Sequence, residues 1–320
     1  MNTDLSQDRD QLVRKPSPAK PVDPRVTEQR NPRSTRIDQL STLGIVDLIN
    51  AEDRMVAAAV GEERQEIARA IDLVVDCLNQ GGRLFYVGAG TSGRLGVLDA
   101  SEMPPTYRTD PEMVQGIIAG GPEALVRAQE GAEDKPEDGA AAIDERAVDG
   151  KDFVLGIATS GTTPYVHGAL RRAKERGART GFLLCTHPSE QILRSNDVVI
   201  APLVGPEVIT GSTRMKAGTA TKIVLNTIST AAMVKTGRVY SNLMVDLQVT
   251  CQKLQDRGER ILMETLGVAR DEATRLLEQS GGHVKTAIVM SRLSLNAREA
   301  RQRLESLGGS IAAVIGEPRR

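Results

Sequence analysis

Three loops of this chain combine glycines with hydroxyl side chains, a combination that can bind a phosphate group. They span residues 88–94, 158–164 and 205–222. Glycines let the backbone approach a phosphate closely, and the N-terminus of a helix that follows favours its negative charge. The candidate ligands of a phosphate or of sugar hydroxyls within these loops are Gly90, Thr91, Ser92, Ser160, Gly161, Thr162 and Thr213, with Arg214 and Lys216 as weaker candidates. Loops at the carboxyl ends of strands in one parallel sheet converge on one crevice, so we expect a single site.

Residues 88–94 also match the G-x-G-x-x-G pattern of dinucleotide-binding proteins. Such a protein needs an acidic residue at the end of the second strand to bind the ribose, but residues 119–122 read Ala-Gly-Gly-Pro. The hydroxyls of Thr91 and Ser92 favour a phosphomonoester instead. The sequence therefore favours a sugar phosphate, with a dinucleotide site and a purely structural turn as the alternatives. For the third loop the alternative is an ordinary helix cap followed by a solvated helix face.

Two acidic segments carry candidate catalytic carboxylates. Glu102 lies in the sequence Asp-Ala-Ser-Glu-Met-Pro-Pro-Thr, and Glu133 lies in Glu-Gly-Ala-Glu-Asp. A carboxylate can take up a proton and return it, as general acid–base catalysis requires. From pattern alone, carboxylates in such segments are more often solvated surface groups. Glu102 differs because it lies between an apolar helix and a Pro-Pro turn, where we expect it to be buried.

The composition argues against a nucleic-acid partner. Lys and Arg together number 41 and Asp and Glu 42, which gives a net charge of -1. A nucleic-acid-binding protein usually carries a basic excess or a basic stripe. The chain has no Trp, four Tyr and three Phe, too few for a surface on which bases stack.

The cysteines and histidines are too scattered for a metal site, because metal ligands cluster at short spacings. Cys77, Cys185 and Cys251 lie far apart and are predicted to be reduced thiols. We expect neither a metal nor another cofactor. No apolar run approaches the ~20 residues of a membrane span, and the N-terminus has no apolar signal core. We therefore expect a soluble cytoplasmic protein with no membrane partner.

Short apolar runs alternate with helical stretches along the middle of the chain. The runs are residues 84–87, 116–119, 153–157, 181–184 and 198–200. Such runs suit strands that are buried on both faces, and their alternation with helices predicts an α/β fold with a doubly wound, parallel, five-stranded sheet. The predicted helices include residues 42–49, 62–80, 164–176, 215–234 and 242–262. The first of these is predicted to begin at a hydroxyl cap.

The chain is predicted to divide into three parts. Residues 1–38 are polar and hold five of the fifteen prolines, so they are predicted to be a disordered tail. Residues 39–260 contain the three loops and both acidic segments, and are predicted to be the sugar-phosphate-binding catalytic domain. Residues 261–320 show helical periodicity interrupted by glycine pairs, which predicts a small helical bundle.

Taken together, the motifs resemble those of the N-acetylmuramic acid 6-phosphate etherases, which have the sugar isomerase (SIS) fold. The resemblance rests on residues 93–106, 130–134, 205–222 and 240–246, and runs from about residue 41 to the C-terminus. The glucokinase regulatory protein shares the third of these motifs, so a non-catalytic sugar-phosphate sensor is one alternative. An aldose–ketose isomerase of the same fold is a second. A DNA-binding regulator is a third, but its helix-turn-helix does not suit the proline-rich residues 1–38.

The resemblance implies a reaction and roles for the two glutamates. By motif position Glu102 is the acid/base that eliminates lactate, and Glu133 assists the addition of water. The products would be N-acetylglucosamine 6-phosphate and D-lactate. The resemblance also implies a homodimer whose sites are shared between subunits, and a C-terminal bundle similar to ubiquitin-associated (UBA) domains.

Overall fold

The computed structural model describes residues 25–249 and 251–316. Its centre is a five-stranded parallel sheet with the strand order β2-β1-β3-β4-β5. The strands are β1 (Leu84–Gly88), β2 (Val114–Ile118), β3 (Phe153–Ile157), β4 (Arg179–Leu183) and β5 (Val198–Ile200). Each lies within two residues of its predicted run, and the predicted fold class is confirmed.

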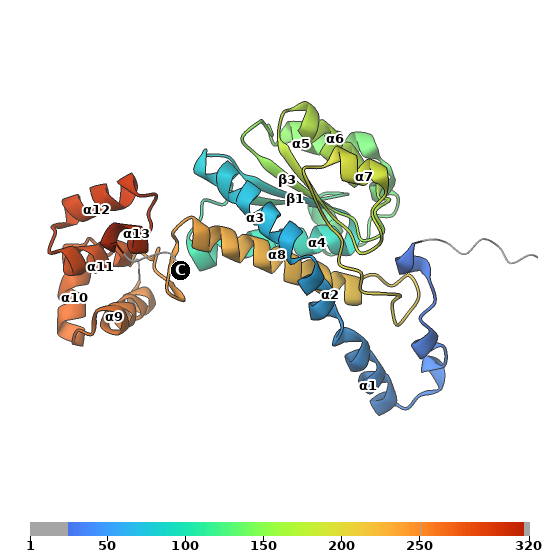
Figure 1. Ribbon diagram of the computed structural model, residues 1–320, viewed down its shortest axis with the longest axis horizontal. Helices are drawn as coiled ribbons and strands as arrows, with labels where there is room; N and C mark the ends of the chain where they lie inside the picture. Colours follow the sequence, from blue (N-terminus) through green and yellow to red (C-terminus); the bar gives the residue numbers. More distant parts are fainter. Residues whose placement is uncertain (1–24, 250, 317–320) are drawn as a thin grey trace, which may run out of the picture.

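Helices cover both faces of the sheet (Figure 1). One face carries α3 (Arg64–Asn79), α4 (Gly90–Tyr107) and α8 (Lys216–Lys235), and the other carries α5 (Pro136–Glu145), α6 (Pro164–Glu175) and α7 (Glu190–Ser195). Successive side chains of a strand point to opposite faces. Leu84, Tyr86 and Leu155 accordingly join the core under α3, α4 and α8, whereas Phe85 and Val154 join the core under α5 and α6. The remaining short helices after β2 are η4 (Pro122–Leu125) and η5 (Ala132–Asp134).

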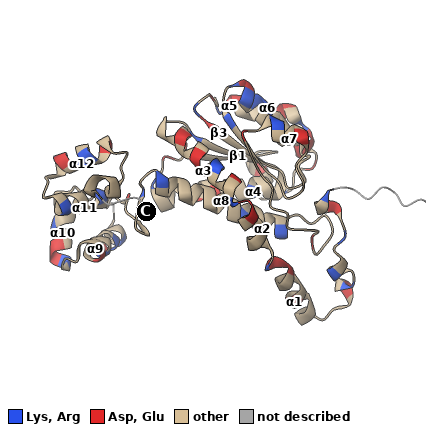
Figure 2. Ribbon diagram, viewed as in Figure 1, with Lys and Arg blue, Asp and Glu red and all other residues tan. Residues whose placement is uncertain are grey.

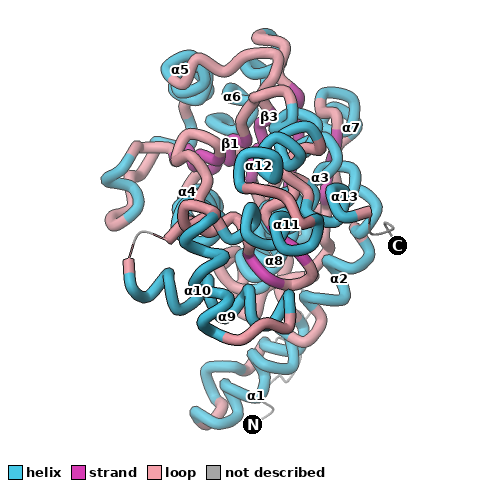
Figure 3. The backbone as a smooth tube through the Cα atoms, turned by 90° about the vertical axis from the view of Figure 1, so that its left-hand side faces the viewer, coloured by secondary structure: helices cyan, strands magenta, loops and turns pink. Residues whose placement is uncertain are grey.

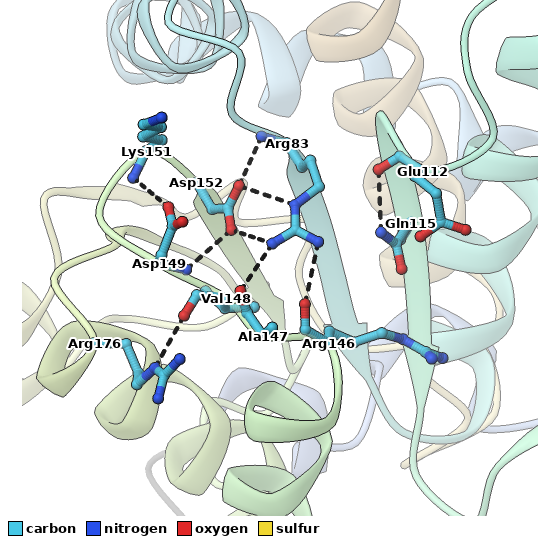
Figure 4. A network of polar contacts seen from close by, with 10 residues as sticks. All are labelled: Arg83, Glu112, Gln115, Arg146, Ala147, Val148, Asp149, Lys151, Asp152 and Arg176. Carbon is cyan, nitrogen blue, oxygen red and sulfur yellow. Dashed lines mark hydrogen bonds and ion pairs between the residues drawn. The ribbon is translucent and has the colours of Figure 1, made fainter.

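A polar network joins the amino ends of the neighbouring strands β1 and β3 (Figure 4). Arg83 precedes β1 and Asp152 precedes β3, and the guanidinium and carboxylate approach to 2.7 Å. Asp152 also accepts a hydrogen bond from the backbone N–H of Arg83 at 2.8 Å and from that of Asp149 at 3.0 Å. The hydrogen bonds and the charge of Asp152 outweigh burial and raise the pKa of Arg83. This network fixes the edge of the sheet opposite to the glycine-rich loops.

The N-terminal segment differs from its prediction. Residues 1–24 of the predicted disordered tail lie outside the described residues, but residues 25–38 form three short 3-10 helices, η1 (Val26–Glu28), η2 (Pro32–Ser34) and η3 (Ile37–Gln39). Thr27, Asn31 and Ser34 are buried there. These polar side chains are buried where they have hydrogen-bond partners. The prediction of disorder considered apolar residues, which are few here, and therefore missed the ordered structure of residues 25–38.

Two further helices lead from this segment to α3. They are α1 (Thr42–Asp53), whose N-cap is the Ser41 hydroxyl, and α2 (Val56–Glu62). Helix α1 extends away from the sheet (Figures 1 and 3). It contains no Lys or Arg (Figure 2), and Leu43 and Val46 on it are 69% and 56% exposed.

The chain ends in a separate helical bundle. A hairpin of β6 (Val239–Tyr240) and β7 (Leu243–Met244) leads to α9 (Gln252–Leu266), α10 (Arg270–Gln279), α11 (Val284–Leu293), α12 (Ala297–Ser306) and α13 (Ile311–Ile315). The prediction of a helix over 242–262 is wrong at its start, because Ser241 has a positive φ of 54° and reverses the chain. The bundle's apolar core includes Val245 and residues of α9, so the bundle begins before the predicted boundary at 261. None of the described helices is long and apolar enough to cross a membrane.

Candidate active site

A cavity of about 270 Å³, called the hydroxyl cavity below, lies where the three predicted loops meet. Loops 88–94 and 158–164 follow β1 and β3, which pair in register at Gly88 and Ile157, and loop 205–222 leads into α8. The cavity brings together six of the predicted site residues, Gly90, Thr91, Ser92, Ser160, Thr213 and Glu133. Hydroxyls therefore line a space at the N-terminus of α4, where a phosphate would be favoured.

The first loop requires its glycines for two different reasons. Gly90 has a positive φ of 52°, which side chains other than glycine rarely adopt. At Gly93 the obstacle is space, since a Cβ there would lie 2.6 Å from Cγ1 of Ile118 and 2.8 Å from the carbonyl oxygen of Gly88. The turn from β1 into α4 is thus held tightly against the sheet. The N-cap residue of α4, Ala89, has no side-chain acceptor with which to cap the backbone N–H groups at this end of the helix.

The second loop divides its hydroxyls between two spaces. Ser160 lines the hydroxyl cavity, and its Oγ lies 2.9 Å from Oγ1 of Thr162. Gly161 and Thr162, both predicted to bind substrate, instead line a hollow of about 800 Å³ beside α6 and α7. Of these predicted residues, the structure therefore places only Ser160 in the cavity. Its contact with Thr162 orients the Ser160 hydroxyl.

The third loop uses its charges for the fold. Glu207 is buried and accepts hydrogen bonds from the backbone N–H groups of Lys216 at 3.0 Å and Ala217 at 2.9 Å. A carboxylate of the protein therefore occupies the N-terminus of α8 in the position that an anionic ligand could take. Burial raises the pKa of Glu207, although those two N–H groups act to lower it.

Lys216 is not available to a ligand. Its Nζ lies 2.6 Å from Oε2 of Glu52, and the two side chains are 2% and 3% exposed. Asn31 donates to the same carboxylate oxygen at 2.8 Å, and Arg33 approaches Oε1 at 3.0 Å. Burial alone would raise the pKa of Glu52, but these contacts outweigh it and lower the pKa. Arg214, the other cation predicted here, is exposed and is not among the residues that line the cavity.

The two candidate catalytic glutamates lie apart in one chain. Glu133, on η5, is exposed and lines the cavity. Glu102 is twelve residues after Gly90 on α4. At about 1.5 Å per residue this places it roughly 18 Å along the helix from Gly90 in residues 88–94, the predicted phosphate loop. It is also exposed, contrary to the expectation that its own chain buries it.

The cavity also contains residues that the sequence did not indicate. Those with polar side chains are Glu28, Thr159, Thr163 and Thr221. Thr159 and Thr163 belong to the hydroxyl-rich second loop, so widening that motif would have found them. Glu28 comes from the segment predicted to be disordered, and only the folded chain places it there. Among the described residues that line the cavity, the charged side chains are the two carboxylates Glu28 and Glu133.

The chain is similar to several known proteins. The glucokinase regulatory protein N-terminal SIS domain matches residues 66–174. The N-acetylmuramic acid 6-phosphate etherase of Crocosphaera subtropica is 54% identical over 290 residues, which cover 91% of this chain and 95% of that protein. That of Trichormus variabilis is 55% identical over 290 residues, which cover 91% and 94%. A phosphoheptose isomerase structure from Francisella tularensis is 17% identical with a TM-score of 0.43, over 61% of this chain and 98% of that one. By its identity to relatives over nearly their whole length, this chain belongs to the N-acetylmuramic acid 6-phosphate etherase family.

Proposed function

We infer that this chain cleaves the D-lactyl ether of N-acetylmuramic acid 6-phosphate and yields N-acetylglucosamine 6-phosphate and D-lactate. The observation that carries this inference is the cavity at the N-terminus of α4, where Thr91, Ser92, Ser160 and Thr213 surround a space that also meets Glu133. Hydroxyls at a helix N-terminus suit the phosphate, and an adjacent carboxylate suits proton transfer. The family of the chain supplies the identity of the substrate.

The reaction follows from the chemistry of the substrate. An alkyl ether resists direct displacement, but opening of the sugar ring exposes an aldehyde at C1 that acidifies the proton on C2. A base removes this proton, the C2–H electron pair forms the C2–C3 double bond, and the C3–O bond to lactate breaks with a proton delivered to the leaving oxygen. Water then adds at C3 and a proton returns to C2. Contacts to the remote phosphate help to position C2 and C3 for these steps.

The proposed roles are Glu102 for proton removal and return, and Glu133 for activation of the water that adds at C3. Because Glu102 lies twelve residues, about 18 Å, along α4 from Gly90 and does not line the cavity of its own chain, we propose that it serves the cavity of a second subunit in a homodimer. A twofold pair is the commonest assembly of identical chains. The exposed apolar side chains of Leu43 and Val46 on α1 are candidates for the contact. The proposed location is the cytoplasm, with the sugar phosphate as the small-molecule partner.

The test is a lactate assay on the purified protein with N-acetylmuramic acid 6-phosphate. Replacement of a general base lowers the rate by ~10²–10⁴-fold, so Glu102→Gln is expected to abolish lactate release and exchange of the C2 proton with deuterated solvent. Glu133→Gln is expected to retain exchange and to accumulate the unsaturated aldehyde, which absorbs in the ultraviolet. The matched control is Glu137→Gln, an exposed glutamate of α5, which is expected to keep full activity.

Three results would contradict the proposal. Binding of the sugar phosphate without any turnover would favour a non-catalytic sensor. Interconversion of glucosamine 6-phosphate with a ketose phosphate would favour an isomerase. Near wild-type turnover in both Glu102→Gln and Glu133→Gln would show that the two carboxylates are surface groups.

A further inference from the structure

Glu28 reaches the hydroxyl cavity from the N-terminal segment. It is half-buried and lines the same cavity as Thr91, Thr213 and Glu133. Its Oε2 lies 3.6 Å from the position that a Cβ on Gly211 would take. The carboxylate therefore stands against the third loop, two residues before Thr213.

Hydrogen bonds on both sides of Glu28 fix this placement. On one side, the backbone N–H of Val26 donates to Oγ1 of Thr186 at 3.3 Å, beyond the end of β4. On the other side, Asn31 donates to the carbonyl oxygen of Pro206 at 3.2 Å and Ser34 donates to that of Val208 at 2.7 Å, beyond the end of β5. The segment thus crosses between two loops at the carboxyl edge of the sheet (Figure 1), where ligands bind in folds of this class.

The wall that carries Glu28 continues to the phosphate loop. A Cβ on Gly218 would lie 3.5 Å from the carbonyl oxygen of Thr213 and 3.6 Å from Cγ2 of Thr91. Glu28, Thr213 and Thr91 are therefore successive parts of one side of the cavity. Glu133 comes from η5, which packs against α6 on the other face of the sheet.

A carboxylate in this place constrains what it can contact. It repels the phosphate and the lactyl carboxylate of the substrate, since like charges in a shared site are unfavourable. Oγ1 of Thr27 already donates to one oxygen of Glu28, Oε1, at 3.3 Å. An ionised carboxylate is only a hydrogen-bond acceptor, so a ligand that contacts the other oxygen, Oε2, must supply a donor such as a sugar hydroxyl. In the ring form of the substrate the free hydroxyls are on C1 and C4, because C2 carries the acetamido group, C3 the ether and C6 the phosphate.

We propose that Glu28 is a specificity-determining residue that accepts a hydrogen bond from the C4 hydroxyl of the sugar phosphate. C4 is the hydroxyl-bearing ring carbon nearer to the phosphate arm, and Glu28 lies on the wall that leads to the phosphate loop. The C4 hydroxyl takes no part in ring opening or elimination, so its contact acts on binding in the ground state and the transition state alike. This inference rests on the proposed function and adds a residue that selects the sugar.

The test compares wild type and Glu28→Ala on the full substrate and on its 4-deoxy analogue. A hydrogen bond to a charged group is worth about 10- to 100-fold in affinity. Glu28→Ala is expected to raise KM by that factor on the full substrate with little change in kcat. On the 4-deoxy analogue the same variant is expected to equal wild type. Glu28→Gln keeps an acceptor oxygen, and a loss of less than about tenfold is expected.

Two outcomes would overturn the inference. An equal loss on both substrates would mean that Glu28 only holds the loop in place, and no loss on either would mean that it makes no contact. The matched control is Arg30→Ala, an exposed residue of the same segment, which is expected to behave as wild type.

A binding measurement separates this inference from the proposed function. N-acetylglucosamine 6-phosphate retains the C4 hydroxyl, so its calorimetric affinity is expected to fall about 10- to 100-fold in Glu28→Ala even if lactate is never released. An unchanged affinity, or no binding by wild type, would overturn the role of Glu28. Absence of lactate release alone would overturn only the proposed reaction.

Discussion

The buried pair of Lys216 and Glu52 allows a direct test of what the third loop does. The sequence suggested Lys216 as a phosphate ligand, whereas the structure places its Nζ 2.6 Å from a carboxylate that is 3% exposed. In Lys216→Met the apolar stem is retained and the charge is removed. Removing one partner of a buried ion pair costs about 3–5 kcal/mol. Asn31 and Arg33 still contact Glu52, so we expect a loss near the lower end, about 3 kcal/mol.

The assay is urea unfolding followed by circular dichroism at several pH values. The pKa of Glu52 is lowered from 4.5 in the folded chain, so its ionisation stabilises the fold at higher pH and this contribution is lost as the pH falls through the folded value. In Lys216→Met the cost of burying the ionised Glu52 carboxylate is no longer offset by the lysine. Protonation of Glu52 at low pH removes the buried charge and so reduces the loss of stability in this variant. The difference between wild type and Lys216→Met is therefore expected to be largest at neutral pH and to shrink towards pH 4.5 and below.

A double variant supplies the control. In Lys216→Met with Glu52→Gln, no charge is left buried and the amide oxygen still accepts from Asn31, so the double variant is expected to be more stable than Lys216→Met alone. The reasoning is refuted if Lys216→Met unfolds at the wild-type urea concentration but raises KM for the sugar phosphate. That result would return Lys216 to the role that the sequence suggested.

The remaining predictions concern the assembly, the phosphate loop, the sheet edge and metals. Glu102→Gln and Glu133→Gln chains are each expected to form no N-acetylglucosamine 6-phosphate, and mixing them with subunit exchange is expected to restore about a quarter of the wild-type rate of its formation, since half of the dimers then hold one intact site in two; no recovery would mean that both glutamates serve one chain's site. Gly93→Ala is expected to lower affinity for the sugar phosphate in calorimetry, because its Cβ would lie 2.6 Å from Ile118; unchanged affinity would show that the loop tolerates the shift. Asp152→Ala is expected to destabilise the chain by about 2–4 kcal/mol in urea unfolding with KM unchanged, because it removes the carboxylate partner of Arg83 and the acceptor of two backbone N–H groups; a change in KM alone would contradict this. Exhaustive EDTA treatment is expected to leave lactate release unchanged, and a loss that a divalent ion restores would contradict the mechanism.

The sequence predicted the sheet well because its strands are buried on both faces. In β3 all five residues are buried, so the run 153–157 is continuously apolar and its bounds match the prediction. Helix α8 was predicted within one residue of its observed ends for a similar reason, since many of its residues are buried. The segment around Ser241 offered no such signal. A single residue with positive φ turns the chain there, and the apolar residues on either side of it fit a helical pattern equally well.

The site was predictable as far as its loops and no further. Glycine and hydroxyl spacing singled out Gly90, Thr91, Ser92, Ser160 and Thr213, which line one cavity, because local backbone requirements leave a local pattern. The pairing of charged side chains leaves no local pattern in the sequence, because Glu52, the partner of Lys216, lies far away along the chain. A Lys or Arg in a loop therefore indicates that an anionic partner is nearby. Only the fold decides whether that partner is a ligand or a carboxylate of the protein.

The same argument explains why the N-terminal segment was misjudged. The number of apolar side chains in a segment indicates how much stability the segment gains when they are buried away from water. Residues 25–38 contain few apolar side chains. Asn31 instead places its amide between Glu52 and the carbonyl oxygen of Pro206, at 2.8 and 3.2 Å, and Ser34 reaches the carbonyl oxygen of Val208. Each of these hydrogen bonds is lost if the segment detaches, and a hydrogen bond contributes about 0.5–1.5 kcal/mol, or more where the acceptor is charged, as in Glu52. The segment is thus held by these polar contacts. One consequence for function is that the position of Glu28 at the cavity depends on Glu52 and, through Glu52, on Lys216.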